Sequence, residues 1–208
     1  MPFPNPLDII IPTLKSREDV AAQVAEITET AGCPVNVIAT CQHVSAAANR
    51  NIGLDQSTSD PLIMLDDDME QFPLGWAVRL ADVLLQTPHA VMASPQLAKP
   101  DGTPGPMMGG VQIRQGGVTR AAQRKLPTAC IAIRRNSLRF DESFLGSGFE
   151  DDDYCAQLRA AHPNAEFLVC HDVWIVHRNE MKNQHGPNWE RNKRYFERKW
   201  DVVENKHQ

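Results

Sequence analysis

Short apolar runs alternate with amphipathic segments in the first third of the chain. Residues 8–12, 35–39 and 62–65 are mainly apolar runs of four or five residues, as buried strands are. Between them, residues 16–31 carry apolar positions at roughly helical spacing, and residues 45–57 are predicted to form a second helix. This order of strands and helices predicts right-handed crossovers and a parallel sheet covered on both faces.

The rest of the chain continues this mixture around one long loop. We predict helices over residues 75–85, from Glu150 onward and over 188–203, and strands over 90–94, 128–133, 166–170 and 173–176. Residues 99–120 are rich in glycine and proline, and a loop of this length is usually functional or mobile. Together with residues 146–148 it is a candidate lid over a site, with a plain surface loop as the alternative.

The composition is that of a globular domain. The chain has 208 residues, 42% of them hydrophobic and 23% charged, which suits one domain with a buried core. No apolar run approaches the roughly 20 residues needed to cross a bilayer, and residues 1–6 lack the regions of a signal peptide. We therefore expect a cytoplasmic protein without an integral membrane segment. The five cysteines form no CxxC pair, which argues against a zinc knuckle.

The charge is distributed unevenly along the chain. The formal net charge of -5 disfavours general nucleic-acid binding through a basic surface. Residues 171–208 nevertheless carry a net charge of +2, against -7 for the preceding 170 residues. The basic side chains that could contact a polyanion, or simply form a solvated face, are Arg114, Arg120, Arg124, Lys125, Arg191, Lys193, Arg194, Arg198 and Lys199.

Three adjacent carboxylates, Asp66, Asp67 and Asp68, follow the strand predicted over residues 62–65. In open α/β sheets, ligands sit outside the carboxyl ends of the strands. Carboxylate oxygens favour hard cations such as Mg²⁺ or Mn²⁺, and a cation would also neutralise the repulsion among the three charges. The segment therefore indicates a metal site, with a solvated acidic turn as the alternative.

Three further residues could complete a site. Asp151 lies in an acidic helix start, where a carboxylate could act as a general base or simply stabilise the helix dipole. His177 ends an apolar run and could supply a nitrogen ligand to a metal, although a histidine at a strand end is more often structural. Arg50, on the helix predicted over residues 45–57, could pair with phosphate or lie on the surface.

The order of the motifs along the chain resembles that of one family. The motifs are IIPT at 10–13, NRNIG at 49–53, LDDD at 65–68, FEDDDYCAQLR at 149–159 and WIVH at 174–177. This order resembles the GT-A glycosyltransferases, especially the family 2-like inverting enzymes. The segment EDDD and the later IVHRNEMKN are also similar to motifs of the β-1,4-galactosyltransferases.

The resemblance implies an α/β fold of the GT-A (Rossmann-like) type, with a mixed, mainly parallel central sheet flanked by helices. No internal repeat or domain boundary interrupts the sequence, so residues 1–208 are expected to form a single domain. Within it, residues 1–98 would be the nucleotide-binding half, residues 99–187 the acceptor and catalytic half, and residues 188–208 the C-terminal helix.

The resemblance also assigns residues to a nucleotide-sugar donor. Pro12 and Thr13 would lie beside the nucleobase, and Arg50 would help to hold the nucleotide. Asp66 would contact the ribose or the metal, and Asp67 belongs to the same donor-binding segment. A UDP-sugar is the leading donor.

The catalytic and metal roles follow from the same resemblance. Asp68 and His177, with Asp66 in support, would bind Mn²⁺ or Mg²⁺. Asp151 would be the base that takes the proton of the acceptor hydroxyl, and Glu150 would orient the acceptor. The implied reaction is a single displacement that moves a sugar from a nucleotide-sugar to a hydroxyl with inversion.

One departure and several alternatives remain open. Many members of the family carry an acidic residue after the second strand that reads uracil, and residues 38–41 lack one. The acceptor could be a saccharide, a glycoconjugate or a hydroxylated base in DNA. The alternative functions are a nucleotidyltransferase, whose glycine-rich phosphate loop is missing from residues 13–17, and a non-catalytic sugar- or cation-binding module. The oligomeric state is not predicted.

Overall fold

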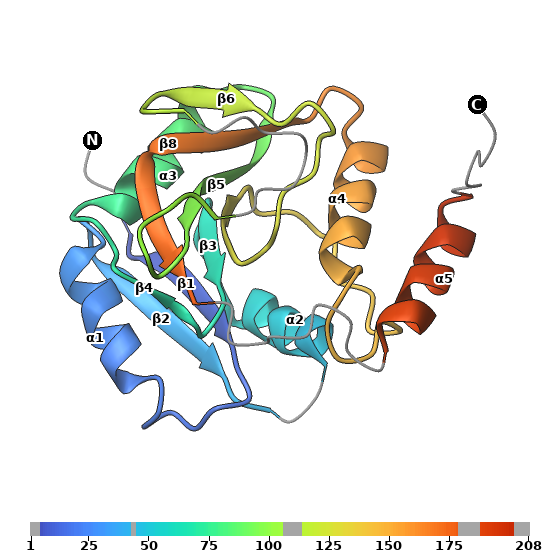
Figure 1. Ribbon diagram of the computed structural model, residues 1–208, viewed down its shortest axis with the longest axis horizontal. Coiled ribbons are helices and arrows are strands. Elements are labelled where there is room, and N and C mark those ends of the chain that lie inside the picture. The colour runs from blue at the N-terminus through green and yellow to red at the C-terminus, as the bar shows by residue number, and fades with distance from the viewer. Residues whose placement is uncertain (1–4, 43–44, 106–113, 179–187, 202–208) are drawn as a thin grey trace.

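A mixed sheet runs through the centre of the computed structural model, with helices on both sides (Figure 1). The structure describes residues 5–42, 45–105, 114–178 and 188–201. The strands are β1 (Leu7–Pro12), β2 (Val35–Thr40), β3 (Leu62–Leu65), β4 (Met69–Glu70), β5 (Ala90–Ala98), β6 (Val118–Arg120), β7 (Cys130–Ile133) and β8 (Glu166–His177). The helices are α1 (Ala21–Thr30), α2 (Ala46–Gln56), α3 (Trp76–Gln86), α4 (Glu150–Ala161) and α5 (Trp189–Lys199).

The strand order of the sheet is β2-β1-β3-β7-β5-β8-β4, and β6 pairs with β8 off this path. The pairs β1–β2, β1–β3 and β5–β8 are parallel, whereas β7 runs antiparallel to both β3 and β5. Because two antiparallel pairings restore the direction, β1, β3, β5 and β8 all point the same way. Their carboxyl ends therefore share one edge of the sheet. The predicted fold class, a mixed α/β sheet flanked by helices, is confirmed.

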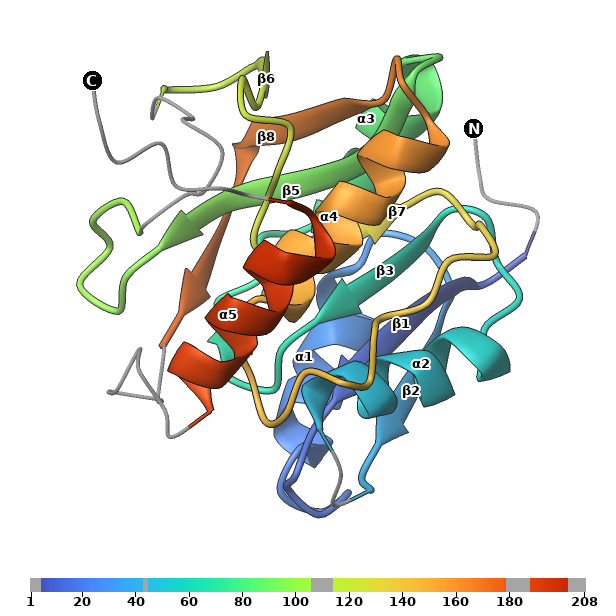
Figure 2. The same cartoon turned by 90° about the vertical axis from the view of Figure 1, so that its right-hand side faces the viewer.

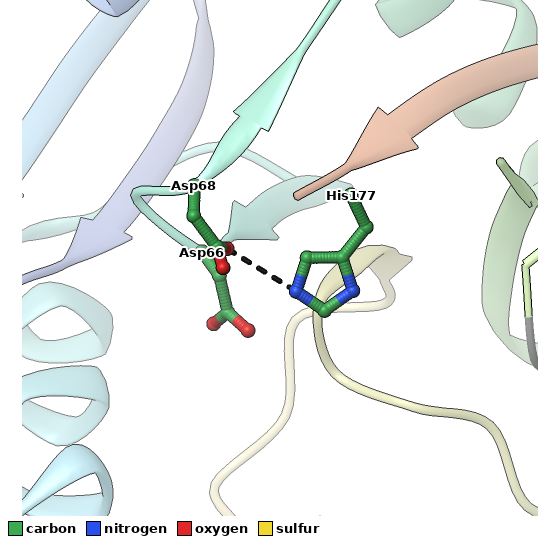
Figure 3. A group of neighbouring side chains, drawn as sticks. All are labelled: Asp66, Asp68 and His177. Carbon is green, nitrogen blue, oxygen red and sulfur yellow. Dashed lines mark ion pairs between the residues drawn. The ribbon is translucent and has the colours of Figure 1, made fainter. Parts of the chain in front are cut away.

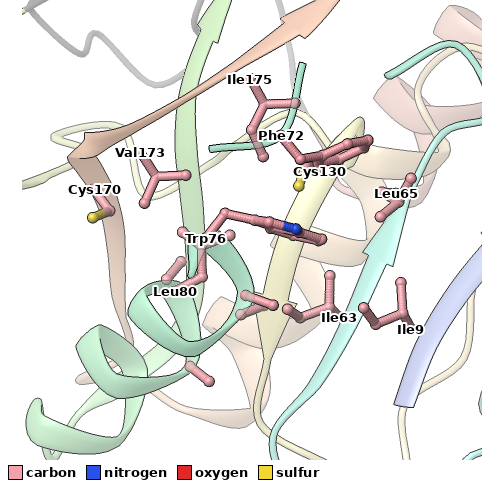
Figure 4. Packing of buried hydrophobic residues seen from close by; sticks show 14 of the residues in the cluster. Ile9, Ile63, Leu65, Phe72, Trp76, Leu80, Cys130, Cys170, Val173 and Ile175 are labelled. Atoms are coloured by element: carbon pink, nitrogen blue, oxygen red, sulfur yellow. The ribbon is translucent and has the colours of Figure 1, made fainter. Parts of the chain in front are cut away.

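The side chains of the strands alternate between two hydrophobic clusters, one on each face of the sheet. Ile9 and Ile11 of β1 belong to the first cluster with α1 and α3, and Ile10 belongs to the second with α2 and α4. Figure 4 shows Trp76 of α3 inside the first cluster, with side chains of β1, β3, β7 and β8 around it. Both sides of the sheet are thus buried, which explains why β1 and β3 read as continuous apolar runs.

Helix α2 approaches β1 very closely at Gly53, the glycine of the NRNIG motif. A Cβ atom at this position would lie 2.2 Å from Cγ2 of Ile10, which is fully buried. Alanine would gain about 1 kcal/mol in helix propensity, but overpacking a core costs about 1–3 kcal/mol. So close an approach to a buried side chain calls for the upper part of that cost, about 2–3 kcal/mol. We therefore expect Gly53→Ala to lower the free energy of unfolding by about 1–2 kcal/mol net, measured as a lower urea midpoint at an unchanged slope.

Leucine at position 10 lacks the β-branch that collides with the added methyl group. The double variant Gly53→Ala/Ile10→Leu should therefore lose less stability than the two single changes added together. A single Gly53→Ala variant as stable as the parent protein would contradict the close packing of α2 on β1.

Several elements differ from the prediction in their boundaries. Helix α1 begins at Ala21 and not at Ser16, because Ser16 and Asp19 bond each other and form a separate turn. The strands predicted at 166–170 and 173–176 are one strand, β8, whose pairing with β5 shifts register between Pro95 and Gln96. The short strands β4 and β6 were not predicted.

Helix α5 lies beside α4 at the outside of the molecule (Figures 1 and 2). Its described part agrees with the predicted C-terminal helix, whose last predicted residues, 202 and 203, lie outside the described ranges. Residues 106–113 of the candidate lid also lie outside them. None of the helices in the described ranges has the length and apolar character needed to span a bilayer.

Candidate active site

Three side chains with metal-ligand atoms converge where β3 and β8 end. Asp66 and Asp68 follow β3, and His177 is the last residue of β8. One ligand atom of each lies within 4.8 Å of the other two. Met69 in β4 pairs with His177 in β8, and this pairing brings the acidic turn beside the histidine. Figure 3 shows the three side chains together, with the ion pair between Asp68 and His177 dashed.

The electrostatics of the trio favour a positive charge between the two carboxylates. His177 Nε2 lies 3.2 Å from Asp68 Oδ1. Burial disfavours the charged imidazole, but the hydrogen bond to Asp68 and the charges of Asp68 and Asp66 outweigh it and raise the pKa of His177. Burial and the neighbouring charge of Asp68 raise the pKa of Asp66, although Arg50 opposes them. Two carboxylates and one imidazole fit a divalent cation such as Mn²⁺ or Mg²⁺.

The acidic turn is held in place by residues that carry no local signal in the sequence. The side-chain amide of Gln23, on α1, donates to the carbonyl oxygens of Asp66 (3.0 Å) and Met69 (2.9 Å). The backbone N–H of Asp66 donates to the carbonyl of Ala129 at 2.8 Å. The sequence alone does not point to Gln23, because a lone glutamine on an amphipathic helix does not indicate which turn it will contact.

Asp67 points to a different set of partners from its two neighbours. Its carboxylate accepts the hydroxyl of Thr13, and its Oδ1 lies 3.4 Å from Lys15 Nζ. Thr13 is itself buried, and its backbone N–H donates to the carbonyl of Thr40. The structure therefore places Thr13, next to Pro12 at the end of β1, against the acidic turn, and Asp67 joins the two segments.

Arg50 bridges the acidic turn and the start of α4. Its two terminal nitrogens donate to Asp66 Oδ1 at 3.1 Å and to Glu150 Oε1 at 3.0 Å. The side chain is only 5% exposed, and its guanidinium lies 5.3 Å from the ring centroid of Phe140. Burial alone would lower the pKa of Arg50, but the charges of Asp66 and Glu150 raise it. Arg50 is therefore a buried cation between two carboxylates and not a surface arginine.

The asparagines on either side of Arg50 fix the helix that carries it. Asn49 donates to the carbonyl of Thr13 at 3.3 Å. The side-chain amide of Asn51 donates to the carbonyl of Phe140 at 2.9 Å, and Oδ1 of Asn51 accepts from the backbone N–H of Phe140 at 2.8 Å. The NRN motif thus ties α2 to the end of β1 on one side and to the segment before α4 on the other.

The carboxylates at the start of α4 differ in their surroundings. Glu150 is buried and accepts from Arg50 and from the backbone N–H of Gly148. Asp151 is half-buried, and burial together with the charges of Glu150 and Asp152 raises its pKa to about 7. A carboxyl group with a pKa near neutrality can accept a proton from a reacting hydroxyl and release it again.

The other two acids of the EDDD segment are engaged in structural contacts. Asp152 Oδ1 lies 3.0 Å from Lys125 Nζ. Asp153 is fully buried and accepts from Trp200 Nε1 at 2.8 Å and from Lys199 Nζ at 2.8 Å. These contacts fasten the start of α4 to Lys125 and to the C-terminal end of α5.

Solved structures share this architecture at low sequence identity. TarS of S. aureus (residues 1–349) in complex with UDP-GlcNAc has a TM-score of 0.64 and 13% identity, covering 98% of this chain and 68% of that one. GalNAc-T7 with UDP, GalNAc and Mn²⁺ has a TM-score of 0.57 and 15% identity, covering 92% of this chain and 43% of that one. This chain has a GT-A fold. A197 from STIV has a TM-score of 0.55 and 12% identity, and the match covers 83% of this GT-A chain and 85% of A197.

The comparisons detect the GT-A fold through structure and not through overall sequence similarity. No protein-family model matches the chain, and no curated protein matches it in sequence. The chain spans less than half the length of GalNAc-T7, and 37% of another TarS structure. At this level of identity the comparisons establish the GT-A fold alone.

Most of the basic residues considered for a polyanion have acidic or carbonyl partners within the described chain. Arg120 pairs with Glu166, Lys125 with Asp152, and Lys199 with Asp141 and Asp153. The guanidinium of Arg124 donates to the carbonyls of Ala165, His162 and Pro163, and that of Arg191 donates to the carbonyl of Ser143. These contacts favour the solvated-face interpretation over a dedicated polyanion site.

Proposed function

We propose that this protein is an inverting, metal-dependent glycosyltransferase that moves a sugar from a UDP-sugar to an acceptor hydroxyl. The observation that carries the proposal is the link between the two halves of the site. Arg50 joins Asp66, in the metal-ligand trio, to Glu150, the residue before Asp151. A cation site and a carboxyl group with a raised pKa thus belong to one network, as a reaction with a leaving group on one side and an attacking group on the other requires.

Asp66, Asp68 and His177 would hold the cation. A divalent cation at this place would stabilise the negative charge that develops on the departing diphosphate. Asp66 is anchored by Arg50 and by the backbone of Ala129, so its carboxylate is preorganised. Since both terminal nitrogens of Arg50 bind carboxylates, its support of the nucleotide would be exerted through Asp66.

Asp151 would take the acceptor proton. As the acceptor oxygen bonds to the anomeric carbon, the bond from that carbon to the diphosphate oxygen breaks, and UDP leaves with the electron pair. The acceptor proton passes to the carboxylate of Asp151. Because this is one displacement from the side opposite the leaving group, configuration at the anomeric carbon inverts. Glu150, held by Arg50 and Gly148, would orient the acceptor.

The donor assignment draws on both the site and the neighbours. TarS was crystallised with UDP-GlcNAc and GalNAc-T7 with UDP and Mn²⁺, and both share the GT-A fold of this chain. Pro12 ends β1 and Thr13 follows it beside the acidic turn, which suits a nucleobase contact. We assign residues 1–98 to the donor side and residues 99–187 to the acceptor side. The acceptor class stays open among saccharides, glycoconjugates and hydroxylated DNA bases.

Donor binding and turnover test the proposal directly. We expect one of UDP-glucose, UDP-galactose, UDP-GlcNAc and UDP-GalNAc to raise the melting temperature when Mn²⁺ is present and to raise it much less after EDTA treatment. The same donor should release UDP slowly, with water as the acceptor. A chain that is stabilised by these donors but releases no UDP would be a binding module. A chain that is neither stabilised nor active would contradict the proposed function.

A further inference from the structure

The segment that leads into Asp151 has an unusual backbone. Gly146, Gly148 and Phe149 have φ values of 66°, 107° and 71°, all in the left-handed region. Phe149 precedes the first residue of α4, and its side chain makes no capping hydrogen bond. Left-handed conformations cost free energy, most for a non-glycine residue such as Phe149, and persist only where the surroundings impose them. Contacts from elsewhere in the chain must therefore hold this segment.

Asn192, on α5, supplies several of these contacts, beside the N–H of Ala46 on α2, which donates to the carbonyl of Gly146 at 3.1 Å. The side chain of Asn192 is fully buried. The amide Nδ2 donates to the carbonyls of Leu145 and Gly148, both at 3.0 Å, and Oδ1 accepts from the N–H of Leu145 at 3.2 Å. One side chain thus bonds backbone groups at both ends of residues 145–148. Such groups are costly to leave unpaired when they are buried.

The same helix encloses the segment with aromatic rings. The ring of Phe149 lies 5.3 Å from that of Trp189 and 5.7 Å from that of Phe196, measured between centroids. A Cβ atom added at Gly148 would lie 3.3 Å from Trp189 Cδ1. Helix α5 therefore packs directly on the residues that place Glu150 and Asp151, and Figure 2 shows it lying along α4.

Hydrogen bonds connect Asn192 to the metal-ligand trio without a break. Asn192 holds the carbonyl of Gly148, and the N–H of Gly148 donates to Glu150 Oε2. Glu150 Oε1 accepts from Arg50, which in turn donates to Asp66. A displacement of Gly148 would therefore move Glu150, the neighbour of Asp151, while Asp66 would stay anchored by the sheet and by Gln23.

We infer that Asn192 is a positioning residue for the proposed base, and that α5 holds the start of α4 in its reactive arrangement. This role rests on the proposed function for its chemical meaning. It predicts that loss of the Asn192 amide impairs turnover and leaves donor and metal binding intact. A purely structural role would lower stability and activity together.

The test compares Asn192→Ala with Tyr195→Phe. Tyr195 lies on the same helix and donates to Asp141 Oδ2 at 2.9 Å. Its variant therefore also removes a hydrogen bond between α5 and the loop that precedes α4. That variant leaves Gly148 untouched. For Asn192→Ala we expect the kcat of UDP release to fall about 10–100-fold, the loss typical of a misplaced catalytic group. The KM for the donor and the stabilisation by Mn²⁺ should not change, and the pH midpoint of kcat should move. Tyr195→Phe should keep the kcat and the pH midpoint of the parent.

Hydrogen exchange separates this inference from the proposed function. In Asn192→Ala, the amides of residues 145–149 should exchange faster than in Tyr195→Phe at equal global stability. Equal exchange rates at residues 145–149 in the two variants would overturn the inference. A kcat in Asn192→Ala that falls only in proportion to the loss of melting temperature would also overturn it. If the parent protein binds no UDP-sugar and releases no UDP, the proposed function fails, and the exchange comparison still decides whether Asn192 holds this segment.

Discussion

Asp151→Asn should lower the rate of UDP release about 10²–10⁴-fold, the contribution typical of a general base, while binding of the UDP-sugar with Mn²⁺ is retained. Asparagine keeps the shape of the side chain but cannot accept the proton. In the parent protein the base must be ionised, and its pKa is raised to about 7. The rate should therefore fall as the pH is lowered through about 7, and the variant should lack this step in its profile.

Loss of folding does not explain the expected defect of Asp151→Asn. A carboxyl group whose pKa is raised in the folded state costs stability once it is ionised. The neutral asparagine removes that cost, so above about pH 7 the variant should be at least as stable as the parent. The measurements are UDP release from pH 5 to 9 and the thermal melt at both ends of this range.

Asp152→Asn is the matched control for Asp151→Asn. Asp152 lies in the same helical turn and pairs with Lys125 at 3.0 Å. Its charge is one cause of the raised pKa of Asp151. The control should therefore keep a high turnover and shift the pH midpoint downward. Full turnover in Asp151→Asn, or an equal loss in both variants, would rule out Asp151 as the base.

Removal of a proposed metal ligand should have the second large effect. Asp68→Asn and His177→Ala should each weaken Mn²⁺ binding by more than about 100-fold, because even residues that only support a ligand change metal affinity about 10–100-fold. Turnover should be lost at Mn²⁺ concentrations that saturate the parent protein and should return only partly at much higher concentrations. Isothermal titration with Mn²⁺, followed by UDP release across a Mn²⁺ series, measures both effects.

Asp67→Asn is the control within the same acidic turn. Its carboxylate contacts Thr13 and Lys15 and does not belong to the trio. The variant should bind Mn²⁺ about as tightly as the parent, even if the contact between β1 and the acidic turn is weakened. If Asp67→Asn reduced Mn²⁺ affinity as much as Asp68→Asn, or if His177→Ala left it unchanged, the assignment of the trio would be wrong.

The sequence predicted the chemical groups of the site better than their partners. Asp66 to Asp68 at the end of an apolar strand, and the acids at the start of a helix, are local patterns that the structure bears out. For Arg50, the residues alone indicated a phosphate partner or a surface position, and the family resemblance implied a contact to the nucleotide. Its pairing with Asp66 and Glu150 joins positions 16 and 100 residues away, and no local pattern reports on such a distance.

Apolar runs and helical spacing in the sequence determined the larger elements of this protein, although not the short strands β4 and β6. Runs of four to six mainly apolar residues form buried strands because both faces of the sheet are covered by helices. Only the tertiary structure decided that β7 lies antiparallel between β3 and β5, and that β4 pairs with β8 to bring His177 to the acidic turn. It also decided that Gln23 and Asn192 hold the two halves of the site. Polar side chains such as these find their partners through the packing of whole elements, so their neighbours in sequence do not reveal what they bind.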